Sequence, residues 1–180
     1  MKNFLKWALI IGMINIVVGI ISYLVGGSVD ATGNIGGTRQ ILGWVGHIGG
    51  ITCLFLGIKQ KKDMDPADFT FGRGWVEGFM ISLIAAVIIG LWTFIYFSMI
   101  DPEMVEAIKN ATFAAMAKTQ PAQNIEAARG YMEFFISPTG FALIGFISLI
   151  FGGMFLSLII SAIVNAMRGK SKSSGEMANA

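Results

Sequence analysis

Charged residues are scarce in this chain: Asp, Glu, Lys and Arg make up 13% of its 180 residues, whereas soluble domains carry about 25%. Hydrophobic residues make up 54%. Half of the usual solvating surface is therefore missing, and a soluble globular domain is not expected. The formal net charge is only +2 at pH 7, and the basic residues are spread along the chain, so we expect no nucleic-acid partner.

Cysteine and histidine each occur once, as Cys53 and His47. A lone thiol cannot form a disulfide within the chain or a redox-active pair. A lone histidine, with one cysteine and no carboxylate in the same apolar run, offers too few ligands for a metal site, and paired-histidine haem ligation is excluded. The sequence also lacks HExxH and CxxC motifs and a plausible Ser–His pair. We therefore expect no metal, no cofactor and no enzymatic activity.

Long apolar runs, in contrast, occupy most of the length. Four of them cover residues 4–24, 41–58, 75–100 and 141–167. A helix of about 20 apolar residues crosses the hydrocarbon core of a bilayer. The sequence therefore predicts an all-α integral membrane protein, a four-helix bundle made by a single domain over residues 1–170. The serine-rich segment 171–180 is expected to be a disordered cytoplasmic tail.

The first apolar run follows Lys2 and Lys6, an arrangement that is also typical of a signal peptide. The run is longer than the apolar region of such peptides, which usually has about 7–15 residues. The small residues that follow it, Gly26-Gly27-Ser28, form a poor cleavage site. An uncleaved first helix is therefore the favoured interpretation.

The thirteen basic residues are divided unevenly between the two sides of the predicted spans. Nine lie before the first span, between the second and third, or after the fourth: Lys2, Lys6, Lys59, Lys61, Lys62, Arg73, Arg168, Lys170 and Lys172. Four lie on the opposite side: Arg39, Lys109, Lys118 and Arg129. Cytoplasmic loops carry the excess of Lys and Arg in membrane proteins. We therefore expect both termini and the central loop in the cytoplasm.

The segment between the third and fourth runs, residues 101–140, carries two amphipathic stripes. Asp101-Pro102 is a helix-start signal, because Asp caps a helix well and Pro fits its first turn. Apolar residues follow at helical spacing on both sides of a break at Pro121. We expect two short amphipathic helices that either lie on the outer membrane surface or pack on each other and cap the bundle.

Small residues recur on the predicted spans at helical spacing. Gly46 and Gly50 form the small-xxx-small pattern that lets transmembrane helices approach closely. We expect five glycines to line helix-packing faces, within the bundle or in a homo-oligomer: Gly43, Gly46, Gly50, Gly152 and Gly153. A backbone site for a ligand is the alternative interpretation of the glycines in the second span.

Four polar residues in or beside the spans are candidates for a functional polar site. Asn15 and His47 lie within spans, where a polar side chain needs a partner or marks a functional position. Arg73 and Glu77 are four residues apart near the start of the third run, so they share one helical face and can pair. One interpretation is an interfacial ion pair and a packing histidine. The other makes Glu77 a proton or cation site and gives His47 a proton or ligand role.

Two segments resemble a known family. Residues 69–75 (FTFGRGW) form an aromatic, glycine-broken elbow before the third run, and Asp101-Pro102 follows that run. Together with their flanking residues they are similar to a bacterial family of four-helix membrane proteins, domain of unknown function 4199. The resemblance implies four spans and a membrane location but no reaction, substrate or catalytic residue. Combined with the charge count, it predicts a multi-pass protein of the bacterial inner membrane.

Two functions compete at this point. We expect a small structural or accessory protein that acts in the lipid bilayer through helix packing and partners, which are a second copy or another membrane protein. The alternative is a small transporter or transporter subunit that uses Glu77 as a proton or cation site. A transporter predicts a polar cavity joining Glu77, His47 and Asn15. An accessory protein predicts a dry, glycine-packed bundle in which these groups are satisfied locally.

Overall fold

The computed structural model describes residues 2–25 and 37–177, with the side chains of the last helix described as far as Met167. Every regular element in these residues is helical, which confirms the all-α prediction. The elements are α1 (Asn3–Val25), α2 (Gly37–Met64), α3 (Phe71–Ile95), a π-helical turn η1 (Tyr96–Ile100), α4 (Pro102–Thr119), α5 (Ala122–Phe135) and α6 (Pro138–Met177). Four are long and apolar enough to cross a bilayer: α1, α2, α3 with η1, and α6. The chain is a multi-pass membrane protein.

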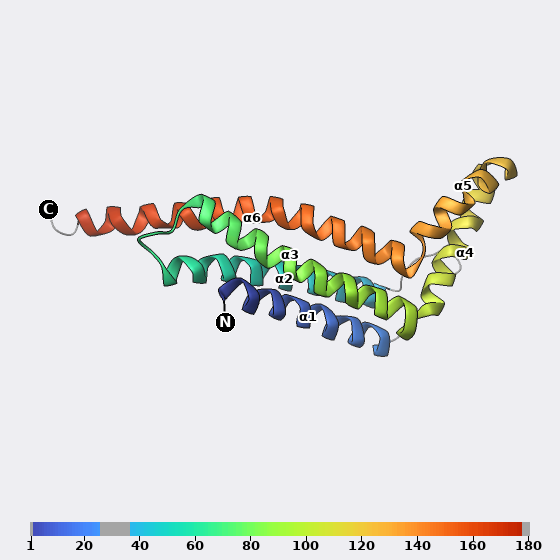
Figure 1. Ribbon diagram of the computed structural model, residues 1–180, viewed down its shortest axis with the longest axis horizontal. Helices are drawn as coiled ribbons and strands as arrows, with labels where there is room; N and C mark the ends of the chain where they lie inside the picture. The colour runs from blue at the N-terminus through green and yellow to red at the C-terminus, as the bar shows by residue number, and fades with distance from the viewer. Residues whose placement is uncertain (1, 26–36, 178–180) are drawn as a thin grey trace.

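The four long helices pack side by side along the long dimension of the molecule (Figure 1). We call α1, α2, α3 and α6 the helical body. The N-terminus and the α2–α3 connection lie toward one end of this body, and α4 and α5 project from the opposite end (Figure 1). Helix α3 contacts each of the other three, and its contact with α6 is the most extensive. It is therefore the central element of the fold.

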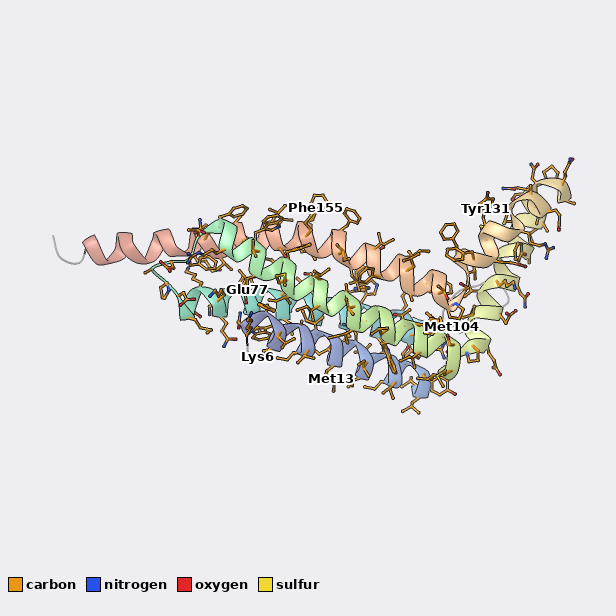
Figure 2. All side chains as sticks on the ribbon, viewed as in Figure 1. Lys6, Met13, Glu77, Met104, Tyr131 and Phe155 are labelled. Carbon is orange, nitrogen blue, oxygen red and sulfur yellow. The ribbon has the colours of Figure 1, made fainter. Side chains whose placement is uncertain are left out.

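The outer surface of the helical body is strongly apolar. Large side chains such as Met13 (59% exposed), Leu91 (62%) and Phe155 (60%) lie on it, and Figure 2 shows Met13 and Phe155 on different helices, directed away from the body. Extensive exposed apolar surface is rare on soluble monomers. Lipid chains solvate such a surface, while the backbone hydrogen bonds are satisfied within each helix.

Side chains from all four long helices meet in one core. Ala8, Ile58, Ile81 and Val164 are fully buried there and come from α1, α2, α3 and α6 respectively. Protein interiors pack as densely as organic crystals, so these contacts hold the helices in a fixed arrangement. The core lies toward the end of the body that carries the N-terminus, and it positions the polar contacts described below.

The starts of α3 and α4 follow capping signals in the sequence. Thr70 Oγ1 accepts a hydrogen bond from the backbone N–H of Arg73 at 3.3 Å. Asp101 Oδ1 accepts one from the backbone N–H of Met104 at 3.3 Å, and Pro102 lies in the first turn of α4. Both contacts satisfy N–H groups that have no partner within the helix. The helix start predicted at Asp101-Pro102 is confirmed.

Helix α6 continues past the end of its apolar run to Met177. The sequence predicted a disordered tail from residue 171, so the structure differs over residues 171–177, and residues 178–180 lie outside the described part of the chain. Once a helix is nucleated, each further residue adds one backbone hydrogen bond. A proline-free polar sequence can therefore extend a helix that began in an apolar segment.

Helices α4 and α5 pack on each other. Lys109 Nζ lies 3.8 Å from Glu133 Oε1, and the Arg129 guanidinium lies 5.3 Å from the centre of the Phe113 ring. No residue of α5 is buried. The sequence left open whether these helices lie on the membrane or cap the bundle; they form a hairpin that extends away from the helical body (Figure 1). We call this hairpin, residues 102–135, the hairpin arm.

Candidate functional site

Glu77 is buried near the start of α3, with 9% of its surface exposed. Its Oε1 accepts a hydrogen bond from Asn3 Nδ2 at 2.8 Å, and the same Nδ2 donates to the Gly57 carbonyl oxygen at 2.9 Å. One amide of α1 thus ties α2 and α3 together, beside the N-terminal end of α1 (Figure 2). Among the side chains that the structure describes, no ion pair joins Glu77 to a basic group. Hydrogen bonding therefore holds this buried carboxylate, and such a bond is stronger where water is excluded.

Further polar contacts link the helices at the same end of the body. Trp7 Nε1 donates to Gln60 Oε1 at 2.7 Å, and Lys6 Nζ approaches the same oxygen at 3.5 Å. Lys62 Nζ donates to the Val164 carbonyl oxygen at 3.1 Å. Indole and ammonium groups of this kind lie well at a membrane interface, with an apolar stem and a polar tip. They join α1 to α2, and α2 to α6.

Arg73 forms an ion pair with Asp68 at 3.0 Å rather than the expected pair with Glu77. The same Nη1 donates to the Asp68 carbonyl oxygen at 3.1 Å, and both side chains are largely exposed. The prediction from four-residue spacing considered only residues on one face of the helix. Asp68 lies in the turn before the helix and offers two acceptor oxygens to Arg73. This exposed pair contributes little to stability, about 0–1 kcal/mol. The prediction of an interfacial ion pair between Arg73 and Glu77 is therefore wrong, and the Glu77 side chain is buried instead.

Asn15 and His47 line a cavity of about 450 Å³ between the four long helices. Asn15 Nδ2 donates to the Ile11 carbonyl oxygen of its own helix at 2.9 Å. His47 is exposed, and its ring centre lies 6.2 Å from that of Trp44 in an edge-on contact. Most of the other lining residues are glycine, alanine or aliphatic. Glu77 is not among them, so this cavity does not join Glu77 to His47 and Asn15 as the transporter hypothesis predicts.

The five predicted packing glycines occupy different environments. A Cβ built at Gly153 would clash with Ser82 on α3, so this glycine allows a close approach of α3 and α6. At Gly46 and Gly50 a Cβ would make ordinary contacts, at 3.5 Å from Asn15 Oδ1 and 3.9 Å from Ile11 Cγ2. At Gly43 and Gly152 it would meet nothing within 4 Å. Gly43 and Gly152 are therefore not close-packing positions within the part of the chain that the structure describes, and their contact with a second copy stays a prediction.

Three further close-packing glycines were not identified from the sequence. A Cβ at Gly78 would lie 2.6 Å from Ser157 Oγ and 2.7 Å from Ile58 Cδ1. Gly12 and Gly57 are comparably close to isoleucine side chains on α3, at 2.6 Å in each case. Small residues at such points let transmembrane backbones approach one another. A glycine's spacing within one helix does not reveal which face meets a neighbour, so only the structure separates these positions from the open ones.

A second polar cluster joins α2 to the start of the hairpin arm. Arg39 Nη1 forms an ion pair with Asp101 Oδ2 at 3.0 Å, and each side chain is only 10% exposed. The Tyr96 hydroxyl donates to the same oxygen at 3.3 Å, and Arg39 Nη1 lies 3.2 Å from Met104 Sδ. The sequence analysis missed this cluster. The available signal was a pair of opposite charges on the same side of the membrane, one before the second span and one after the third.

The Arg39–Asp101 cluster borders a second cavity, of about 270 Å³, between α1, α2 and α3. Asn15 lines this cavity as well, together with Gly43 and the aromatic residues Trp92, Tyr96 and Phe97. Aromatic walls with a few convergent polar groups are typical of sites for small molecules. Within residues 2–25 and 37–167, His, Cys, Asp and Glu side chains do not gather in groups of three that could hold a metal ion.

The comparison with known proteins identifies one family. The family model described as "Protein of unknown function (DUF4199)" matches residues 6–166. No curated protein and no solved structure matches the chain. The matched region includes the greater part of the four long helices, the whole hairpin arm, and the residues Glu77, Arg39 and Asp101 described above. The chain therefore belongs to the DUF4199 family of proteins of unknown function.

Proposed function

We propose that this protein is an accessory protein of the bacterial inner membrane, without enzymatic activity, that docks another membrane protein through its hairpin arm. The observation that carries the proposal is the arm itself. It extends from the helical body as two packed helices (Figure 1), and none of the residues of α5 is buried. Tyr131 is 75% exposed, and Phe134 and Phe135 are each 48% exposed. Aromatic residues presented in this way are enriched at protein interfaces.

The charge distribution supports an orientation for this arm. The cytoplasmic side of a membrane protein carries the excess of Lys and Arg. Lys2, Lys6, Lys59, Lys61 and Lys62 belong to the end of the body opposite the arm. In the proposed orientation both termini are cytoplasmic and the hairpin arm lies on the outer side, where it meets the outward-facing part of its partner.

The competing transporter hypothesis has one observation in its favour, the burial of Glu77 without an ion pair among the described side chains. Intramembrane carboxylates commonly mark proton or ion pathways. Against it, Glu77 is hydrogen-bonded to Asn3 and lines neither the 450 Å³ nor the 270 Å³ cavity. These features support a structural role for Glu77 as a junction between α1 and α3.

Photo-crosslinking in native membranes tests the docking proposal. A benzophenone amino acid placed at Tyr131 on the arm is compared with one at Phe155 on the outer surface of α6; the two sites are marked in Figure 2 and are 75% and 60% exposed. We expect a discrete adduct with one other membrane protein from position 131 only. The same adducts from both positions, no protein adduct from position 131, or an adduct between two copies of this chain would contradict the proposal.

A further inference from the structure

Two lysines at the start of α1 carry positive charges that no described side chain neutralises. The backbone N–H of Lys6 donates to the Lys2 carbonyl oxygen at 3.2 Å, so the two residues lie one helical turn apart on the same face. Among the side chains that the structure describes, neither ammonium group has an ion-pair partner. Lys2 Nζ lies 5.8 Å from the centre of the Phe4 ring, and Lys6 Nζ lies 5.3 Å from that of Trp7. Such contacts attract a cation to the ring face without cancelling its charge.

Charges in and beside the α2–α3 connection, at the same end of the body, are paired with one another. Lys61 pairs with Asp65, and Arg73 pairs with Asp68. The Glu77 carboxylate is buried and forms no ion pair with the two lysines of α1. The first turn of α1 contains no acidic residue, and the dipole of a helix favours an anion at this end. The start of α1 is therefore a place where an anion would be stabilised.

The ammonium group of Lys6 keeps hydrogen-bond donors for a ligand. Its Nζ approaches Gln60 Oε1 on α2 at 3.5 Å, and the same oxygen accepts a hydrogen bond from Trp7 Nε1 at 2.7 Å. An ammonium group has three donors, so at least two of them remain. Tryptophan side chains at the ends of membrane spans lie at the level of the lipid headgroups. Lys6 is therefore placed beside Trp7 at the depth of the lipid phosphates.

An apolar stripe continues along the outer face of α1 from the two lysines. Its members are exposed and recur every three or four residues: Leu9, Met13, Val17 and Ile20. Lys6 and Met13 mark the beginning and the middle of this face in Figure 2. Acyl chains can lie along such a surface, whereas a soluble anion would contact the lysines alone. Positive charge above an apolar stripe therefore matches a ligand that has a negative head and apolar chains.

We propose that Lys2 and Lys6 bind the phosphate of an anionic phospholipid whose acyl chains lie along the apolar stripe of α1. Both ammonium groups donate to phosphate oxygens, in charge-assisted hydrogen bonds. A zwitterionic phospholipid carries its own cation beside the phosphate, so it gains less from the two lysines. This lipid site is independent of the docking role proposed above for the hairpin arm.

Three double variants separate this site from the overall charge of the protein. Lys2→Gln/Lys6→Gln removes both positive charges from the site. Lys61→Gln/Lys118→Gln is the matched control with the same change in net charge, because Lys61 is already paired with Asp65 and Lys118 lies on the hairpin arm. Lys2→Arg/Lys6→Arg keeps both charges, including their effect on the orientation of the first span, and guanidinium groups also bind phosphate.

Native mass spectrometry of the full-length protein in detergent measures the binding of single lipids. Phosphatidylglycerol is compared with phosphatidylcholine of identical acyl chains. We expect the first phosphatidylglycerol to bind more tightly than the first phosphatidylcholine. Its affinity should fall about thirtyfold in Lys2→Gln/Lys6→Gln, as expected for the loss of two lysines at an anionic headgroup. The affinity should stay close to that of the unmodified protein in the control and in the arginine variant. Size-exclusion profiles report whether each variant is folded.

Four results would overturn the proposal. Equal affinities of the unmodified protein for the two lipids would exclude selection of an anionic head, and this comparison needs no variant. Full affinity in folded Lys2→Gln/Lys6→Gln would show that the two lysines do not bind the lipid. An equal loss in Lys61→Gln/Lys118→Gln would indicate attraction by overall charge rather than a site. Displacement of the lipid by an equal concentration of glycerol 3-phosphate would show that the site takes a soluble anion and does not use the apolar stripe.

Discussion

The side chain of Asn3 connects three helices through a single nitrogen. Its Nδ2 donates to the Glu77 carboxylate on α3 and to the Gly57 carbonyl oxygen on α2. A hydrogen bond to a charged group contributes about 1.5–3 kcal/mol, and a buried acceptor that loses its donor costs a similar amount. In or beside a bilayer, water is a poor substitute for the missing donor. The burial of Glu77 therefore depends on Asn3.

We predict that Asn3→Ala lowers the free energy of unfolding by about 1.5–3 kcal/mol, because it strands the Glu77 carboxylate in the core. Glu77→Gln should remain close to the unmodified protein, since an amide oxygen still accepts from Asn3 Nδ2. Combining the two changes should recover part of the loss, because a neutral amide tolerates burial better than a carboxylate does. Unfolding by SDS in mixed micelles measures all three. An Asn3→Ala protein as stable as the parent would show that Asn3 does not hold Glu77.

Among the helices, α3 sets the geometry because it packs against α1, α2 and α6 at once. Gly78 lies where α3 meets both α2 and α6: a Cβ there would be 2.6 Å from Ser157 Oγ and 2.7 Å from Ile58 Cδ1. Ser157 and Ile58 are both fully buried, and Ser157 Oγ is bound to the Gly153 carbonyl oxygen at 2.6 Å. Neither neighbour has free space to move into, so an added methyl group must separate the helices.

We predict that Gly78→Ala destabilises the protein by about 1–3 kcal/mol, the usual range for overpacking a filled interior. Gly152→Ala is the matched control, because Gly152 is also helical but a Cβ there meets nothing within 4 Å. It should be neutral or slightly stabilising, since alanine favours a helix over glycine by up to about 1 kcal/mol. Thermal unfolding in detergent compares the two variants directly. Equal melting temperatures would mean that the α3 contacts adapt to the extra methyl group.

At the scale of the whole molecule, the prediction of four long apolar helices rested on composition alone, because the length of an apolar run already determines whether it can span lipid. Pairings between distant residues could not be predicted in that way. Arg39 and Asp101 are 62 residues apart, and their ion pair follows from how α2 and α3 pack. The same is true of Gly78, whose neighbours lie on two other helices. The predicted ion pair between Arg73 and Glu77 was wrong for a local reason, because Arg73 pairs with Asp68 in the preceding turn.

The proposed function also requires a fixed orientation of the molecule, which cysteine labelling can measure. Ala67, in the α2–α3 connection, and Ala122, at the start of α5, are both exposed and lie at opposite ends of the helical body. Each is changed to cysteine in a Cys53→Ala background; Cys53 is itself buried. In intact cells we expect a membrane-impermeant maleimide to label position 122 only, and position 67 only after permeabilisation, because the basic end stays inside.

The labelling pattern separates the fold from the orientation. Labelling of position 67 but not of position 122 in intact cells would agree with four spans but indicate the opposite orientation. The hairpin arm would then lie in the cytoplasm, and the proposal of a partner on the outer side would be wrong. Labelling of both positions under the same condition would place residues 67 and 122 on the same side of the membrane. Only the third span, α3 with η1, lies between these two residues. The prediction that this continuous apolar run crosses the membrane would then be wrong.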